Sequence, residues 1–373
     1  MTRARRERIS LTDTPYYHCI ARCVRRAFLC GVDDHTGQDF SHRRAWVLKR
    51  MQTLASMFAI DVCAYAIMSN HFHLVLKVNA VQARSWSLNE VIDRWQILFE
   101  VPELVQRCRT GNDVGQAESN RATKIVEEWR GRLHDISWYM RVLNEHIARL
   151  ANAEDRCTGR FWEGRFHSQA LLDEQAVLTC MAYVDLNPIR AQMAATPEES
   201  DFTSIQQRVS TFDAEHKRRR PAETATAPEY PLTHAAATTI ATTEHGGIAR
   251  PETLRCPLLH FVGWEDTNAG IPFREGDYLQ LVDWAGRIVR PDKSGAISSD
   301  MPPILARLGI DDAEFLKYVG PKVSRQEGRR HTKPFPTAVG TPARMKAAAT
   351  EWGRAFLRGV DLAKRLFPRI PAT

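Results

Sequence analysis

The first fifth of the chain alternates apolar runs with one amphipathic stretch. Residues 16–24 (YYHCIARCV) are rich in aromatic and β-branched side chains, which is typical of a strand. Residues 42–59 place their apolar side chains at helical spacing, so they predict a helix with one buried face. Residues 61–68 and 71–78 are apolar runs separated by two polar residues, and they predict two strands joined by a tight turn. The second of these runs is apolar almost throughout, which favours a central place in its sheet.

Helical spacing then continues over residues 85–150, which carry several Trp and Leu residues with a common periodicity. The pattern is interrupted near residues 110–115, and residues 134–150 form the clearest helix of the stretch. We therefore expect a helical insertion between the third and fourth strands of one sheet.

A fourth strand and a further helix are predicted after this insertion. Residues 157–172 are rich in Gly and aromatic side chains, which indicates a turn followed by a strand. Asp173 is well placed to cap the N-terminus of a helix, and Glu174 would interact favourably with the dipole of its first turn. We expect this helix to run through Tyr183 towards Asn187.

The composition changes after residue 210. Residues 217–247 are rich in Ala, Thr, Pro and Glu and show little apolar periodicity, which is typical of a linker. Aromatic and aliphatic residues return at about residue 250. The pattern predicts a first domain over residues 1–210, a linker over 211–249 and a small C-terminal extension domain over 250–373, with no indication of the role of the extension.

The charge balance of the chain is mildly basic. It has 51 Lys and Arg residues against 44 Asp and Glu residues, a net charge of +7. This permits a nucleic-acid partner without establishing one. Basic residues gather in the first eight residues, at 217–220 and within 325–333, although each run alone reads most simply as a solvated surface.

The cellular setting follows from what the sequence lacks. No apolar stretch approaches the roughly 20 residues that span a bilayer, and the first residues are charged rather than apolar as in a signal peptide. We therefore expect a cytoplasmic protein with no membrane partner, whose eight cysteines are reduced and mostly buried. Cys19, Cys23 and Cys30 lie near two histidines, but their spacing fits no familiar zinc pattern.

The first candidate for chemistry is the sequence His71-Phe72-His73. Side chains alternate between the faces of a strand, so His71 and His73 point the same way, about 7 Å apart along the strand. Two imidazoles on one face could hold one divalent cation. Taken alone, the pattern is weak, and a chance pair of surface or core histidines is the more common explanation.

The second candidate is Tyr183, which stands four residues before Asn187 in MAYVDLNPIRA. In a helix this spacing places both side chains on one face, where an amide oxygen could ligate a cation beside a phenol. The alternatives are a tyrosine packed in the core and an asparagine at a helix end, because Pro188 disfavours helical geometry in the residue before it.

Three segments in chain order resemble the HUH single-tyrosine transposases, and more narrowly the REP-associated tyrosine transposase family. They are AYAIMSNHFHLVL, GRFWEGRFHSQALLDE and MAYVDLNPIRA, which contain the His-Phe-His motif at 71–73 and the Tyr-x-x-x-Asn-Pro pattern at 183–188. The resemblance covers about residues 10–200. It implies an α+β domain with a ferredoxin-like antiparallel sheet, helices on one face, and Tyr183 facing His71 and His73.

The resemblance also implies an activity. Tyr183 would attack a phosphodiester of single-stranded or hairpin-forming DNA, giving a covalent 5′-phosphotyrosine and a free 3′-OH that can later be rejoined. His71, His73 and Asn187 would bind Mg²⁺ or Mn²⁺. Some relatives of the wider group carry Gln where Asn187 stands, so at this position the sequence departs from their pattern. The oligomeric state, monomer or homodimer, is left open.

Contacts with DNA are expected from basic and aromatic residues near this site, since Arg binds phosphates and Trp stacks on unpaired bases. The candidates are Arg22, Arg25, Arg160, Trp162, Arg165 and Arg190. Two other functions stay open. The chain could be a non-catalytic DNA-binding protein derived from a transposase, or a metal-dependent nuclease in which water attacks and Tyr183 is structural.

Overall fold

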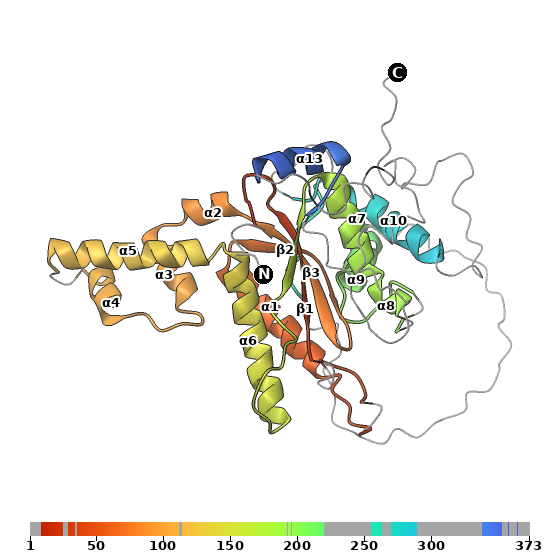
Figure 1. The fold of residues 1–373 in the computed structure, drawn as a ribbon, viewed down its shortest axis with the longest axis horizontal. Helices are drawn as coiled ribbons and strands as arrows, with labels where there is room; N and C mark the ends of the chain where they lie inside the picture. Colours follow the sequence, from red (N-terminus) through yellow and green to blue (C-terminus); the bar gives the residue numbers. More distant parts are fainter. Residues whose placement is uncertain are drawn as a thin grey trace.

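A computed structural model describes the chain in segments. These are residues 9–24, 29–33, 36–111, 114–191, 193–194, 196–219, 255–262, 270–288 and 338–352, with residues 357 and 364. Within them the protein is a mixed α/β structure built around a five-stranded sheet of order β2-β3-β1-β4-β5 (Figure 1).

The strands lie close to where the apolar runs predict them. They are β1 (Tyr16–Arg22), β2 (Ile60–Ile67), β3 (His71–Val78), β4 (His167–Leu171) and β5 (Ala338–Val339). The first four form antiparallel pairs, whereas β5 is parallel to β4. The predicted hairpin and the central place of the third strand are confirmed, since β3 pairs with both β1 and β2.

Helices cover both faces of this sheet, so the prediction of helices on one face is wrong. Helices α1 (Arg43–Met57) and α6 (Ile136–Glu154) pack against each other on one side, and α7 (Glu174–Asp185) packs on β2, β3 and β4 from the other (Figure 1). The reason is visible in β3, where every residue after His71 is buried. A strand that is buried on both faces must be covered twice.

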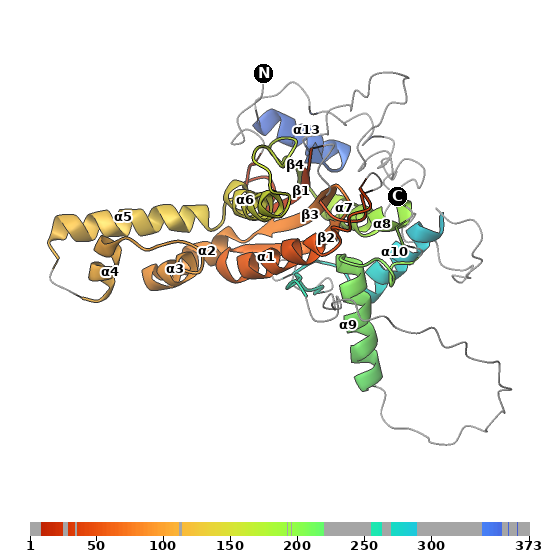
Figure 2. The ribbon, with the colours of Figure 1, turned by 90° about the horizontal axis from the view of Figure 1, so that it is seen from below.

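The predicted helical insertion is present. Helices α2 (Ala80–Ser85), α3 (Leu88–Trp95), α4 (Glu103–Arg109) and α5 (Gln116–Arg132) precede α6. The helices α3, α4 and α5 extend away from the sheet as an arm in both views (Figures 1 and 2). Within the arm, the rings of Trp95 and Trp129 stack with centroids 5.0 Å apart.

The domain boundaries need two corrections. Helix α9 (Ser204–Arg219) runs across the predicted boundary at residue 210, and the rest of the predicted linker, 220–249, lies outside the described residues. In addition, α10 (Glu275–Ile288), β5 and α13 (Pro342–Glu351) pack onto the first part of the chain. The described part of 250–373 therefore shares the core of the sheet instead of building a separate domain, because its apolar residues are buried in that core.

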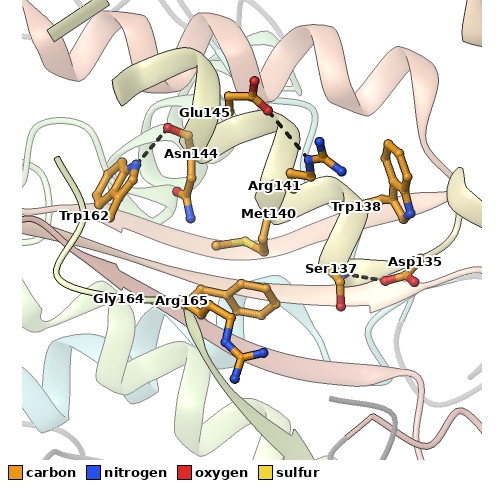
Figure 3. Close-up of a pocket in the computed structure, with 11 residues that line it drawn as sticks. Asp135, Ser137, Trp138, Met140, Arg141, Asn144, Glu145, Trp162, Gly164 and Arg165 are labelled. Carbon is orange, nitrogen blue, oxygen red and sulfur yellow. Dashed lines mark hydrogen bonds and ion pairs between the residues drawn. The ribbon is translucent and has the colours of Figure 1, made fainter. Parts of the chain in front are cut away.

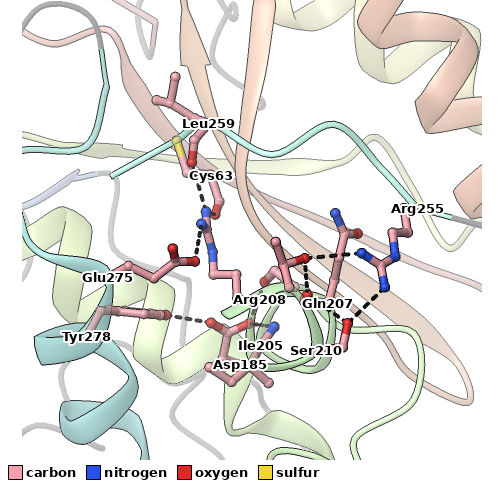
Figure 4. Close-up of polar contacts among 12 residues, drawn as sticks. Cys63, Asp185, Ile205, Gln207, Arg208, Ser210, Arg255, Leu259, Glu275 and Tyr278 are labelled. Atoms are coloured by element: carbon pink, nitrogen blue, oxygen red, sulfur yellow. Dashed lines mark hydrogen bonds and ion pairs between the residues drawn. The ribbon is translucent and has the colours of Figure 1, made fainter. Parts of the chain in front are cut away.

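A buried polar network joins this later part to α7 (Figure 4). Asp185, the last residue of α7, is fully buried and accepts hydrogen bonds from Ser204, from the backbone N–H of Ile205 and from Tyr278 of α10. Burial raises the pKa of the Asp185 carboxyl to about 6. Beside it, Arg208 donates to the carbonyl oxygens of Cys63 and Leu259, both at 3.0 Å.

Among the described helices, none is long and apolar enough to cross a membrane.

Candidate functional site

The register of the sheet brings the two predicted histidines to one face. On β3, His71 lies opposite Arg22 of β1 and His73 lies opposite Ile20. Their side chains therefore project from the same face, with ring centroids 4.8 Å apart. Phe72 between them is fully buried and contacts Trp162, whose segment lies with α6 on the opposite side of the sheet.

Tyr183 reaches the same place from α7. The helix begins at the predicted cap, because the Asp173 side chain accepts a hydrogen bond from the backbone N–H of Ala176 at 2.8 Å. Two and a half turns later, the Tyr183 ring lies edge-on to His73, with centroids 5.8 Å apart. The structure thus brings together Tyr183, His73 and His71 from two elements far apart in sequence.

Burial sets the protonation of this group. It lowers the pKa of His71 to about 4 and that of His73 well below its usual range, so both imidazoles are neutral near pH 7. Burial also raises the pKa of the Tyr183 phenol to about 12, although Arg190 and Asn187 act in the opposite direction. Neutral imidazoles have a lone pair for a cation, and a neutral phenol must lose its proton before it can act as a nucleophile.

Asn187 lies next to the tyrosine but in a break of the helix. Helix α7 ends at Asp185 and the short α8 (Asn187–Arg190) follows, as the sequence Asn-Pro favours. The Asn187 side-chain amide donates a hydrogen bond of 3.1 Å to the backbone carbonyl of Tyr183. This bond uses the amide nitrogen, and the assignment of its oxygen to a cation stays a prediction.

Two cations flank the site. The Arg190 guanidinium carbon lies 5.1 Å from the centroid of the Tyr183 ring. Burial lowers the pKa of Arg190 to about 10, which leaves it charged near pH 7. Arg22, the exposed last residue of β1, lies opposite His71. The two charges suit an anion such as a phosphate beside the Tyr183 ring.

The two imidazoles can supply two ligands to a divalent cation, but the remaining ligands must be neutral or non-protein oxygens, because no carboxylate joins them in the described part of the chain. Within the described residues, no group of three or more His, Cys, Asp or Glu could hold a metal ion. Two neutral imidazoles remain, 4.8 Å apart between ring centroids. Further ligands would be oxygens of an amide, water or a phosphate, which are the ligands that Mg²⁺ and Mn²⁺ accept.

The other predicted DNA contacts are distributed differently. Arg160 and Arg165 are exposed in the segment before β4, where Arg160 donates to the Glu163 carbonyl at 3.4 Å. Trp162 is only 9% exposed, and its indole N–H donates to the Asn144 carbonyl of α6 at 2.8 Å. The structure therefore does not bring Trp162 to the tyrosine, and base stacking on its ring stays a prediction. Arg25 lies outside the described residues.

A cavity of about 490 Å³ lies between α6 and this segment (Figure 3). Trp138, Met140, Trp162 and Phe166 provide its apolar lining, while Arg141 and Arg165 line it with charge. It lies on the α6 side of the sheet, away from the histidine pair. The cavity is therefore separate from the group around Tyr183.

Two residues of the site were missed by sequence reasoning. His18 of β1 and Gln169 of β4 are both fully buried on the same face as the pair. Nε2 of His18 lies 2.9 Å from Nδ1 of His73, and Nδ1 of His18 lies 3.4 Å from Oε1 of Gln169. The available signal was a pair of polar residues, His18 and Arg22, on one face of β1, but it becomes useful only with the strand register.

Comparison with known proteins adds one structural likeness. No protein-family model matches the sequence, and no curated protein matches it. Among solved structures, a REP-associated tyrosine transposase bound to a REP hairpin aligns with 65% of this chain and with all of its own chain. The TM-score is 0.33 and the sequence identity is 12%.

Proposed function

We propose that this chain is a single-tyrosine transposase that cleaves and rejoins single-stranded DNA. The observation that carries the proposal is the packing of Tyr183 against His73, with His71 on the same sheet face and the Arg190 charge over the Tyr183 ring. The antiparallel order β2-β3-β1-β4, with α1 and α6 as crossover helices, supports a ferredoxin-like core.

The chemistry proposed for Tyr183 is an in-line displacement at phosphorus. The phenol loses its proton as its oxygen bonds to the phosphate, the bond to the 3′ oxygen breaks, and that oxygen leaves with a proton as a 3′-OH. The phosphate stays on Tyr183 as a 5′-phosphotyrosine. Because the phosphotyrosine linkage is itself a phosphodiester, formed in exchange for the one that breaks, a 3′-OH can attack it in the reverse reaction and rejoin DNA without ATP.

The flanking groups have distinct parts in this proposal. Arg190 and Arg22 bind the phosphate and offset the charge that grows on it in the transition state. A Mg²⁺ or Mn²⁺ ion held by His71 and His73, with Asn187 as a further ligand, would supply Lewis-acid polarisation of the scissile phosphate. The neutral state of both imidazoles suits them to that task.

The substrate class follows from the same argument. Tyr183 is only 6% exposed, and a flexible single strand can approach such a residue more readily than a stiff duplex. We therefore propose single-stranded DNA, presented beside a hairpin, as the substrate. Exposed Arg160 and Arg165 are candidates for binding its backbone.

The test is capture of the covalent intermediate. Labelled hairpin oligonucleotides with single-stranded flanks, taken from palindromic repeats around the gene, are incubated with protein and Mg²⁺ or Mn²⁺ and resolved on a denaturing gel. Wild type should give a slow-migrating protein–DNA species and a fragment with a free 3′-OH. Tyr183→Phe should give neither, while its binding to the same DNA stays close to wild type.

Tyr139→Phe is the matched control, since Tyr139 is a fully buried tyrosine of α6 on the other side of the sheet. It should form the adduct like wild type. Cleavage without any adduct would favour a nuclease that uses water. Binding with no cleavage by wild type on any flanking hairpin would favour a non-catalytic DNA-binding protein.

A further inference from the structure

The buried polar side chains behind the histidine pair form one connected chain across three strands. His18 lies opposite Gln169 in the pairing of β1 with β4, and Ile20 lies opposite His73 in the pairing of β1 with β3. His18 and His73 are therefore diagonal neighbours on the face that α7 covers. His18 and Gln169 have no exposed surface and His73 is 2% exposed, so water does not compete for their hydrogen bonds.

The direction of hydrogen bonding in this chain is set at Gln169. Its Oε1, an acceptor only, faces Nδ1 of His18 at 3.4 Å, so Nδ1 of His18 carries the proton. A neutral His18 then has a lone pair on Nε2, which lies 2.9 Å from Nδ1 of His73 and accepts from it. Nδ1 of His73 therefore carries its proton, and the Nε2 lone pair of His73 is left available.

His71 reaches the same tautomer by a separate route. Its Nδ1 lies 2.7 Å from Oδ1 of Asn70 in the turn before β3. An amide oxygen only accepts, so Nδ1 of His71 is the donor and its Nε2 has the lone pair. Two independent hydrogen bonds thus leave the same nitrogen, Nε2, available on both imidazoles.

We propose that His18 and Gln169 are positioning residues that hold His73 in the Nδ1–H tautomer, so that its Nε2 can bind a divalent cation. The role of that cation in DNA cleavage rests on the proposed function, whereas the tautomer and the binding of the cation do not depend on it. In metal sites, a partner on the second ring nitrogen fixes the tautomer and raises the basicity of the ligand. Here that partner is another imidazole, oriented in turn by an amide. If the Gln169 amide were turned, both imidazoles would reverse, and a proton on Nε2 would prevent metal binding.

The first measurement is the tautomer itself, in ¹⁵N-labelled full-length protein without DNA or metal. Long-range ¹H–¹⁵N spectra distinguish a protonated from an unprotonated ring nitrogen. We expect wild-type His73 to carry its proton on Nδ1. Gln169→Met removes the acceptor at the end of the chain, and His18→Phe removes the middle imidazole. Both should leave His73 with a mixture of tautomers.

The second measurement is Mn²⁺ affinity by electron paramagnetic resonance, again without DNA. Both variants should bind Mn²⁺ about 10- to 100-fold more weakly than wild type, as loss of such outer partners does elsewhere. The matched control is His134→Phe, because His134 also bonds through Nδ1, to the Arg130 carbonyl, but lies far from the site in the helical insertion. It should leave both readouts unchanged.

The outcomes separate this inference from the proposed function. A wild-type His73 with its proton on Nε2, or variants with an unchanged His73 tautomer and Mn²⁺ affinity, would overturn the inference even if the DNA adduct forms. Conversely, a wild type with the Nδ1–H tautomer and Mn²⁺ binding but no DNA adduct would uphold the inference and count against the transposase. Should His18→Phe not fold, the wild-type spectrum and Gln169→Met still decide.

Discussion

The hydroxyl of Tyr278 donates a hydrogen bond of 2.5 Å to Oδ2 of Asp185. This contact joins α10, from the later part of the chain, to the last residue of the helix that carries Tyr183 (Figure 4). Both side chains have no exposed surface. The end of the Tyr183 helix is therefore held by a residue that lies far beyond the segments carrying the histidine pair and Tyr183.

Tyr278→Phe should lower the free energy of unfolding by about 1–3 kcal/mol, because it removes one donor to a buried carboxylate and leaves an oxygen unpaired. Urea unfolding measures the change. Tyr139→Phe is the control, since the Tyr139 hydroxyl is buried without a hydrogen-bond partner in the described part of the chain. It should be neutral or slightly stabilising. Equal midpoints for the two variants would show that the Tyr278 bond contributes nothing.

Arg43→Met tests the junction between α1 and α6. The Arg43 side chain is 1% exposed and pairs with Glu154, at 2.5 Å, and with Asp155. Both carboxylates keep some access to water, so we expect a loss of about 2–3 kcal/mol, less than for a fully buried pair. Arg149→Met, which breaks an exposed pair with Glu145, should cost less than about 1 kcal/mol. The comparison is made by urea unfolding, and similar losses for both would contradict the argument from burial.

The strands and the Tyr183 helix were predictable because their signals are local. The apolar runs gave β2 and β3 within a residue, and Asp173 is the observed cap of α7. The nearly continuous apolar run of β3 is typical of a strand buried on both faces, so the covering of both sheet faces was also predictable, although the prediction was of helices on one face. By contrast, β5 pairs with β4 across a long stretch of sequence, and two residues carry no pattern that could predict such a pairing.

In the candidate site too, residues with a local sequence signal were predictable, and residues that depend on strand pairing were not. Sequence spacing places His71 and His73 on one face of a strand, the family resemblance implies that Tyr183 faces them, and the structure brings the three together. His18 and Gln169 join them only through the register of β1 with its two neighbours. Nothing in the spacing of single residues predicts a register, so these two could not be found before the fold was known.

Arg190→Gln should slow formation of the DNA adduct by about 100- to 1,000-fold, because it removes the charge beside the Tyr183 ring that would offset the growing phosphate charge. Arg190→Lys should recover part of the rate. Single-turnover assays on the hairpin substrate measure both. Arg121→Gln, which neutralises an exposed Arg on the insertion arm, is the control and should behave like wild type. A full rate for Arg190→Gln would remove this residue from the phosphate site.

His71→Ala tests the imidazole pair directly. Removing one of two neighbouring imidazoles should weaken cation binding and slow cleavage by about 100-fold or more, since polarisation of a phosphate by a metal contributes several kcal/mol. Affinity for the hairpin should change little, because it rests on phosphate contacts elsewhere. Raising the Mn²⁺ concentration should restore part of the cleavage by mass action, whereas it should not rescue Tyr183→Phe, which lacks the attacking oxygen.

His134→Ala, in the insertion, serves as the control for His71→Ala and should cleave at the wild-type rate. If His71→Ala cleaves normally at low Mn²⁺, the pair is not a metal site, and the neutral imidazoles beside Tyr183 need another explanation.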